Sequence, residues 1–195
     1  MADEDLQFGN KNWCNDGWCN DIQDQGRCGA GWSFAAVAAV ETTYAIKHSS
    51  LPSLSAQECI DCKPDGCTSN RTALSCIRRM QKHGISTSQA YPYTGIASTC
   101  KKDTPKSPVE IFNYTYIKNL TESVILDHLN KGPVIASLDA SSYSFINYSG
   151  GILNSVSCKR GFNNHWVLIV GYGVDHYIIR NSWGKQWGLK TLISG

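Results

Sequence analysis

Nine cysteines lie in this chain of 195 residues, and they constrain its fold more than any other feature of the sequence. Such a density is typical of secreted chains held together by disulfides and is uncommon in a reducing compartment. An odd number leaves at least one thiol free or paired with another chain. Buried, reduced cysteines are the alternative, and this interpretation suits Cys59 and Cys76 best. The full set is Cys14, Cys19, Cys28, Cys59, Cys62, Cys67, Cys76, Cys100 and Cys158.

Composition and charge exclude several classes of protein. A chain of this length, 42% hydrophobic, suffices for one globular unit or two subdomains that share an interface. The net charge is only +2 and no run of Lys or Arg exceeds a pair, so we expect no nucleic-acid partner. The longest apolar stretch, residues 32–40, is far shorter than the ~18 residues that span a bilayer, so no membrane span is expected.

The first residues bear on the compartment. Residues 1–5 are acidic and lack the hydrophobic segment of a signal peptide, so the chain is either cytosolic or a processed domain. The cysteines favour the second option, which predicts a secreted or lysosomal/vacuolar location. Cys14 and Cys19 flank an Asp-Gly turn signal, which favours a local disulfide, and a zinc site with two further ligands is the alternative.

The first half of the chain has helical patterns. Residues 32–47 are apolar on nearly all faces, which predicts a helix buried on most sides. Residues 55–58 read Ser-Ala-Gln-Glu, a capping-box sequence that predicts the start of a short helix. Residues 71–83 form a third helical pattern that stops at Gly84, a usual helix end.

The second half is mainly β-like. Residues 101–108 hold two prolines and three lysines and predict a linker or surface loop, in which Lys101, Lys102 and Lys106 are solvated. Apolar β-branched runs predict strands at 134–138, 166–172 and 177–180, and one helix is expected at about 121–130. The two halves together predict an α+β arrangement.

One cluster of residues points to a specific chemistry. A cysteine protease needs a thiolate near a helix N-terminus, a histidine, a group that orients the histidine, and donors for the oxyanion. A known signature is Cys-Gly-Ser/Ala-Cys-Trp/Tyr, with His and Asn about 130–150 residues downstream. Residues 28–32 read Cys-Gly-Ala-Gly-Trp, so Gly31 stands at the nucleophile position. His165 follows 134 residues later and Asn181 150 residues later, which preserves the spacing of the site without its sulfur.

This pattern resembles the papain-like cysteine proteases (papain and the cathepsins). Further motifs follow in family order across about residues 22–188, namely Ser-Ala-Gln-Glu at 55–58, Tyr-Pro-Tyr at 91–93, Gly-Pro-Val at 132–134, Gly-Gly-Ile at 150–152, Asn-His at 164–165, Gly-Tyr-Gly at 171–173 and Asn-Ser-Trp-Gly at 181–184. The resemblance implies a two-lobed α+β fold with a helical N-terminal lobe, an antiparallel β-barrel-like C-terminal lobe and a cleft between them. It implies one domain over 1–195, mainly helical in 1–108 and mainly β in 109–195.

The resemblance also implies roles for single residues. Gln25 resembles the side-chain donor to the oxyanion, His165 the catalytic base and Asn181 its orienting partner. Trp183 resembles the indole that shields the His–Asn contact from water. The implied disulfides are Cys28–Cys67 and Cys62–Cys100, and the family partner of the cysteine that matches Cys158 lies beyond residue 195.

No other side chain is expected to replace the nucleophile. Ser33 lies two positions past Gly31, about 200° around a helix, and Cys28 is the expected partner of Cys67. A water activated by His165 is the remaining route, but loss of the nucleophile typically costs about 10⁶-fold in turnover. Without a thiolate, His165 loses the anion that favours its imidazolium, so we expect it to titrate like an ordinary histidine.

Two departures from the family pattern concern the groove. Thr68, Ser69 and Asn70 stand where the family usually has Asn-Gly-Gly, and their β-carbons would narrow the groove. Trp166 stands where the family usually has a small residue that lines the main specificity pocket. It is large enough to fill that pocket, and packing in the core is the alternative.

The sequence therefore predicts a catalytically inactive papain-like homologue with a binding, regulatory, storage or antigenic role. We expect a monomer, with a peptide or protein ligand in the cleft and no cofactor or metal. The alternative is a cysteine endopeptidase whose catalytic Cys was mutated to Gly. A ligand- or carbohydrate-binding module has no supporting motif. His176 is interpreted as a surface histidine rather than a metal ligand with His165, and the glycosylation candidates are Asn70, Asn113, Asn119 and Asn147.

Overall fold

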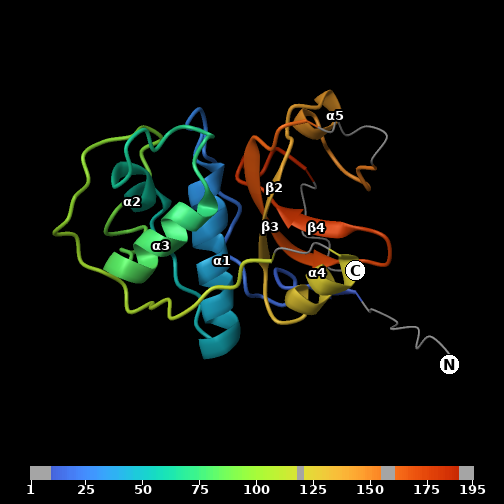
Figure 1. Cartoon of the computed structure of the whole chain (residues 1–195), viewed down its shortest axis with the longest axis horizontal. Helices are drawn as coiled ribbons and strands as arrows, with labels where there is room; N and C mark the ends of the chain where they lie inside the picture. Colours follow the sequence, from blue (N-terminus) through green and yellow to red (C-terminus); the bar gives the residue numbers. More distant parts are fainter. Residues whose placement is uncertain (1–9, 118–120, 155–160, 189–195) are drawn as a thin grey trace.

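The computed structural model describes residues 10–117, 121–154 and 161–188 of the chain. Within these ranges the helices are α1 (Gly31–His48), α2 (Ala56–Asp61), α3 (Ala73–His83), α4 (Glu122–Leu129) and α5 (Tyr143–Ile146). The strands are β1 (Lys11–Asn12), β2 (Val134–Leu138), β3 (His165–Tyr172) and β4 (Tyr177–Arg180). Helices α1 to α3 lie on one side of the molecule, and the strands lie with α4 and α5 on the other (Figure 1).

Helix α1 is the central element, as its apolar pattern predicts. It packs against α2 and α3 on one side and against β3 on the other. Helix α1 has alanines at positions 35, 36, 38 and 39, and their short side chains let these elements approach closely. The Trp32 indole is fully buried and donates to the carbonyl of Gly66 at 3.2 Å. Helix α1 therefore places its N-terminus between the helical part and the sheet.

The ends of α2 and α3 follow their sequence signals, with one difference. Ser55 Oγ accepts a hydrogen bond from the Glu58 backbone N–H at 3.0 Å, which is the predicted cap of α2. The reciprocal half of the capping box is absent, because the Ser55 N–H donates to the Ser86 carbonyl. Helix α3 ends at Gly84, whose φ of 69° is a left-handed conformation that favours glycine.

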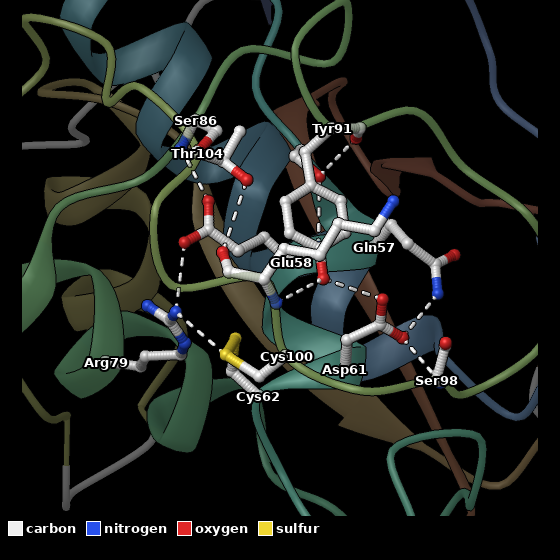
Figure 2. Close-up of a disulfide and its surroundings, with 12 residues drawn as sticks. Gln57, Glu58, Asp61, Cys62, Arg79, Ser86, Tyr91, Ser98, Cys100 and Thr104 are labelled. Atoms are coloured by element: carbon white, nitrogen blue, oxygen red, sulfur yellow. Dashed lines mark hydrogen bonds and ion pairs between the residues drawn. A yellow bond between two sulfur atoms is a disulfide. The ribbon is translucent and has the colours of Figure 1, made fainter.

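Glu58 instead ties α2 to Arg79 of α3 and to Ser86 (Figure 2). It also contacts Lys106 of the 98–107 loop. Its fully buried carboxylate accepts from Arg79 at 2.9 Å, from the Ser86 backbone N–H at 2.7 Å and from Lys106. Burial opposes ionisation of Glu58, but the bonds from Lys106 and Ser86 and the Arg79 charge outweigh it and lower its pKa. Lys106 lies on an exposed loop, as the sequence predicted, but its ammonium group also pairs with the buried carboxylate of Glu58.

Four disulfides join eight of the cysteines. Cys28 pairs with Cys67 and Cys62 with Cys100, as the family resemblance implied. Cys59 pairs with Cys76, so the interpretation of these two as reduced core residues is wrong, because α2 and α3 pack closely enough to bring them together. Cys14 pairs with Cys19, which leaves neither thiol for zinc. Cys158 lies outside the described residues.

The strands form one antiparallel sheet around β3. Strands β1, β2 and β4 all pair with β3, and Leu138 lies opposite His165 in the register. Strand β1 has two residues and α5 has one turn, so neither gives a periodic signal, and both were missed in the sequence. On one face of the sheet, Leu126 and Leu129 of α4 pack on Ile169 and Tyr172.

The helical part and the sheet meet along α1. Ala39 of α1 packs against Leu168 and Val170 of β3, and residues before α1 also lie against the sheet. Asp24 forms an isolated bridge with Trp183, which follows β4. Among the described residues, no helix combines the length and apolar character needed to cross a membrane.

Candidate functional site

Gly31 lies buried at the first position of α1. The segment before it is held by the Cys28–Cys67 disulfide and by the Gly29 N–H, which donates to the Cys67 carbonyl at 2.9 Å. A β-carbon on Gly29 would lie 2.8 Å from the backbone nitrogen of Ser69, so only glycine allows this approach. The nucleophile position is thus rigidly placed at the helix N-terminus, although it carries no side chain.

His165 lies opposite, at the first residue of β3, and Asn181 follows β4. His165 Nε2 and Asn181 Oδ1 are 2.8 Å apart, and the same oxygen accepts from the Ser182 backbone N–H at 2.8 Å. An amide oxygen only accepts, so the neutral imidazole carries its proton on Nε2 and turns an unprotonated Nδ1 away from Asn181. The Trp183 ring lies 4.9 Å from the imidazole between centroids and covers it.

Burial governs the charge of His165. The residue is only 7% exposed, and this burial lowers the pKa of its imidazole, while the bond to Asn181 raises it in part. The sequence predicted that His165 would titrate like an ordinary histidine, whereas burial lowers its pKa below the ordinary value. The ring is therefore neutral near pH 7.

The imidazole also occupies the space beside Gly31. A β-carbon on Gly31 would lie 2.6 Å from His165 Cε1 and 2.7 Å from His165 Nδ1. It would also lie 3.2 Å from the Trp166 carbonyl oxygen. Any side chain at position 31 thus requires a shift of a ring that Asn181 and Trp183 hold in place.

Gln25 lies in the same cleft and is held on three sides. Its Nε2 donates to the Cys28 carbonyl at 2.8 Å, and its Oε1 accepts from Ser182 Oγ at 2.7 Å. Its backbone carbonyl accepts from Tyr93 Oη at 2.7 Å, and burial raises the pKa of this phenol to about 12. An amide NH₂ has two hydrogens, and among the described residues the second Gln25 N–H has no acceptor. Tyr93 was noted in the sequence only as part of a motif, because its contact with Gln25 spans 68 residues.

A groove of about 320 Å³ lies between the helical part of the molecule and the sheet. Its lining is Gln25, Gly29, Gly31, Trp32, Ser69, Ala140, Ile146, Asn164, His165, Trp166 and Trp183. Of the predicted groove residues, Ser69 and Trp166 thus lie in the lining, whereas Thr68 and Asn70 are exposed beside it. Trp166 is half-buried and also packs against the helical core, so it belongs to both environments. Ile146 was missed because it lies on the unpredicted α5.

The described side chains offer no replacement for the nucleophile. Ser33 Oγ is buried and donates to the Ala56 carbonyl at 2.7 Å, so it faces away from the groove as predicted. Cys28 is in a disulfide. Ser69 carries the one hydroxyl of the groove lining, and no described hydrogen bond joins it to His165.

The remaining candidates lie elsewhere. His176 is bonded to Asp175 at 2.9 Å on the surface, and no cluster of metal ligands occurs in the part of the chain that the structure describes. Asn70, Asn113 and Asn147 are exposed, and Asn119 lies outside the described residues.

Comparisons with known proteins agree with this geometry. A family model described as "Papain family cysteine protease" matches residues 9–194. Macrodontain-1 of Ananas macrodontes is 36% identical over 180 residues, which are 91% of this chain and 83% of that protein. Cathepsin J of Mus musculus is 32% identical over 94% of this chain, which spans only 58% of that protein's length. The solved structure of the Carica candamarcensis cysteine protease CMS1MS2 in complex with E-64 is similar with a TM-score of 0.86 and 32% identity, covering 92% of this chain and 84% of that one.

Proposed function

The chain belongs to the papain family of cysteine proteases and has its two-lobed α+β fold, and we propose that it is a member without peptidase activity that uses the cleft to bind a peptide or protein. The contact between Gly31 and His165 carries this proposal. The β-carbon position of residue 31 lies 2.7 Å from His165 Nδ1, so the imidazole fills the place where a nucleophile would stand. The site therefore has no nucleophilic atom at position 31, and the His165 ring occupies the space beside it.

The rest of the cleft supports retention of binding. Gln25 lines the groove with one N–H that has no acceptor among the described residues, and Trp183 and Ile146 offer apolar surface to a ligand. A concave, mostly apolar surface with a few placed donors is typical of ligand sites. Binding without turnover is consistent with a regulatory, storage or antigenic role for a monomer.

The location and domain structure belong to the same proposal. Four disulfides favour an oxidising compartment, so the protein acts outside the cell or in a lysosome or vacuole. The chain forms one domain of two lobes that divide near residue 108.

The decisive experiment compares the wild-type chain with Gly31→Cys. We expect no peptide cleavage by the wild-type chain and no recovery of turnover in Gly31→Cys, because the new β-carbon collides with the His165 ring. Peptide cleavage and labelling of residue 31 by an active-site-directed thiol reagent are the measurements. Recovered turnover in Gly31→Cys would support the alternative, an endopeptidase inactivated by a single change.

Gly31→Ala is the matched control, because it adds the β-carbon without the sulfur. Alanine is normally better than glycine in a helix by up to about 1 kcal/mol. Overpacking against His165 should reverse this sign and cost about 1–3 kcal/mol in the free energy of unfolding. Equal losses in Gly31→Ala and Gly31→Cys, measured by denaturant unfolding, would identify the collision as their common cause.

Binding is tested separately in the wild-type chain. Added peptides that enter the groove should shift the NMR signals of the Trp183 indole and the His165 imidazole. A diverse peptide mixture at millimolar concentration that shifts neither signal would contradict the binding half of the proposal.

A further inference from the structure

Residues 109–117 connect the helical part to α4 and hold a feature that the cleft does not explain. Val109 is buried and Ile111 packs against the helical core. Gln81 Nε2 of α3 donates to the Phe112 carbonyl at 3.0 Å, and Arg78 Nε donates to Tyr114 Oη at 3.2 Å. Helix α3 therefore fixes this connection, which runs beneath it as the yellow-green segment of Figure 1.

Three aromatic rings on this connection face solvent. Phe112 is 78% exposed, Tyr116 is 70% exposed and Tyr114 is 37% exposed. We refer to Phe112, Tyr114 and Tyr116 as the aromatic strip. Grouped exposed apolar side chains usually mark a surface that another group covers.

A glycosylation sequon lies within the aromatic strip. Asn113, Tyr114 and Thr115 form Asn-x-Thr, and Asn113 is exposed between Phe112 and Tyr114. Asn113 Oδ1 accepts from the Tyr114 backbone N–H at 2.8 Å, while its Nδ2 has no partner among the described residues. The nitrogen that receives a sugar is thus accessible, and its oxygen is already held in one orientation.

The other described sequons differ in these respects. Asn147 Nδ2 donates to the Tyr143 carbonyl at 3.0 Å at the end of α5, so its nitrogen is used by the fold. Asn70 is exposed, but its sequence neighbours are Ser69 and Arg71, neither of which is aromatic. Asn113 alone among them combines a free nitrogen with neighbouring exposed rings.

We propose that Asn113 carries an N-linked glycan whose first sugars lie over the aromatic strip and shield it from solvent. In the transfer, Asn113 Nδ2 loses one hydrogen and bonds to the anomeric carbon of the sugar, whose bond to a lipid pyrophosphate donor breaks. Four disulfides indicate a compartment where such modification takes place. A covalently tethered sugar is held at high effective concentration beside the rings, so it covers them better than a free ligand does.

The first test asks whether Asn113 is modified. The chain is secreted from eukaryotic cells, treated with a peptide N-glycosidase in H₂¹⁸O and digested for mass spectrometry. We expect most Asn113 to appear as ¹⁸O-labelled Asp, and Thr115→Ala to remove that label without changing the four disulfides. Secreted, folded protein with unlabelled Asn113 would overturn the proposal.

The second test asks whether the glycan covers the strip. The double variant Phe112→Ser, Tyr116→Ser keeps the sequon, and we expect native N-glycosidase to release its glycan severalfold faster than from the wild-type chain. Phe162→Ser is the matched control, because Phe162 is 95% exposed and lies elsewhere in the sequence. An unchanged release rate would refute the shielding role. A glycosylated dimer that the double variant abolishes would instead identify a second copy as the cover.

Discussion

At the base of the cleft, the loss of one side chain changes the chemistry of its neighbours. With no thiolate at position 31, His165 has no anion to stabilise its positive charge, and burial lowers its pKa. Asn181 Oδ1 accepts a hydrogen bond from His165 Nε2, so the unprotonated His165 Nδ1 faces Gly31. His165 and Asn181 therefore form a neutral pair whose imidazole lies against position 31.

His165 should titrate below the ordinary histidine pKa of 6.5. The unfolded chain then binds more protons than the folded chain below about pH 6.5, so the free energy of unfolding falls as pH drops from there toward the folded pKa. NMR titration of the His165 ring measures the pKa, and denaturation at several pH values measures the stability. The His165→Gln variant should lose this pH-dependent part of the free energy of unfolding. A His165 pKa above 6.5 would contradict the prediction.

At the scale of elements, a buried carboxylate organises the helical lobe. Glu58 of α2 accepts from Arg79 of α3, from the Ser86 backbone and from Lys106 of the following loop. Each partner is far from Glu58 in sequence, so these bonds fix how the elements pack rather than how each one forms. The capping-box pattern predicted where α2 begins, while the real partners of Glu58 depended on packing.

Glu58→Gln should destabilise the folded chain by about 3–5 kcal/mol, because it leaves two cations around a neutral amide. The Glu58 pKa is lowered from 4.5 in the folded chain, so its stabilisation is present above about pH 4.5 and is lost as pH falls through the folded pKa. Denaturant unfolding of both proteins across this range is the measurement. Exposed Glu110→Gln is the control, and an equal, small loss in both variants would show that the network contributes little.

Across the whole molecule, the covalent links are unevenly distributed. All four disulfides lie within residues 14–100, and three of them join segments of the helical lobe. The sheet depends on β3 pairing and on its packing against α1 and α4. The lobe that carries Gly31 therefore holds three disulfides, while Cys14 and Cys19 pack against β3. Among the described residues, the strands around His165 are positioned by noncovalent contacts.

Disulfide removal should reflect the length of chain that each bond closes. Cys62 and Cys100 are 38 residues apart, whereas Cys14 and Cys19 are 5 apart. Chain entropy predicts that the free energy of unfolding falls by about 4 kcal/mol at 25 °C when Cys62 and Cys100 are both replaced by serine. The same replacement of Cys14 and Cys19 should lower it by about 2 kcal/mol. Denaturant midpoints of both proteins test this order. A larger loss from the Cys14–Cys19 pair would show that local contacts, not loop length, govern the effect.

The sequence by itself predicted the fold class and the bounds of the longer elements. Residues 32–47, 71–83 and 134–138 correspond to α1, α3 and β2, because apolar periodicity and helix-end residues are local signals. The spacing of Gly31, His165 and Asn181 likewise predicted which residues would meet. Strand β1, with two residues, and α5, with a single helical turn, have too few positions for a periodic signal, whereas the apolar run of β4 was predicted.

Only the tertiary structure determined which contacts these residues make with one another. The closure of His165 over Gly31, the pairing of Cys59 with Cys76 and the recruitment of Lys106 by Glu58 all join segments that are distant in sequence. Such contacts depend on how close two packed elements approach, and no local pattern encodes that distance. The sequence therefore identified the glycine at the nucleophile position, and only the packed fold determined that the His165 imidazole lies against the β-carbon position of residue 31.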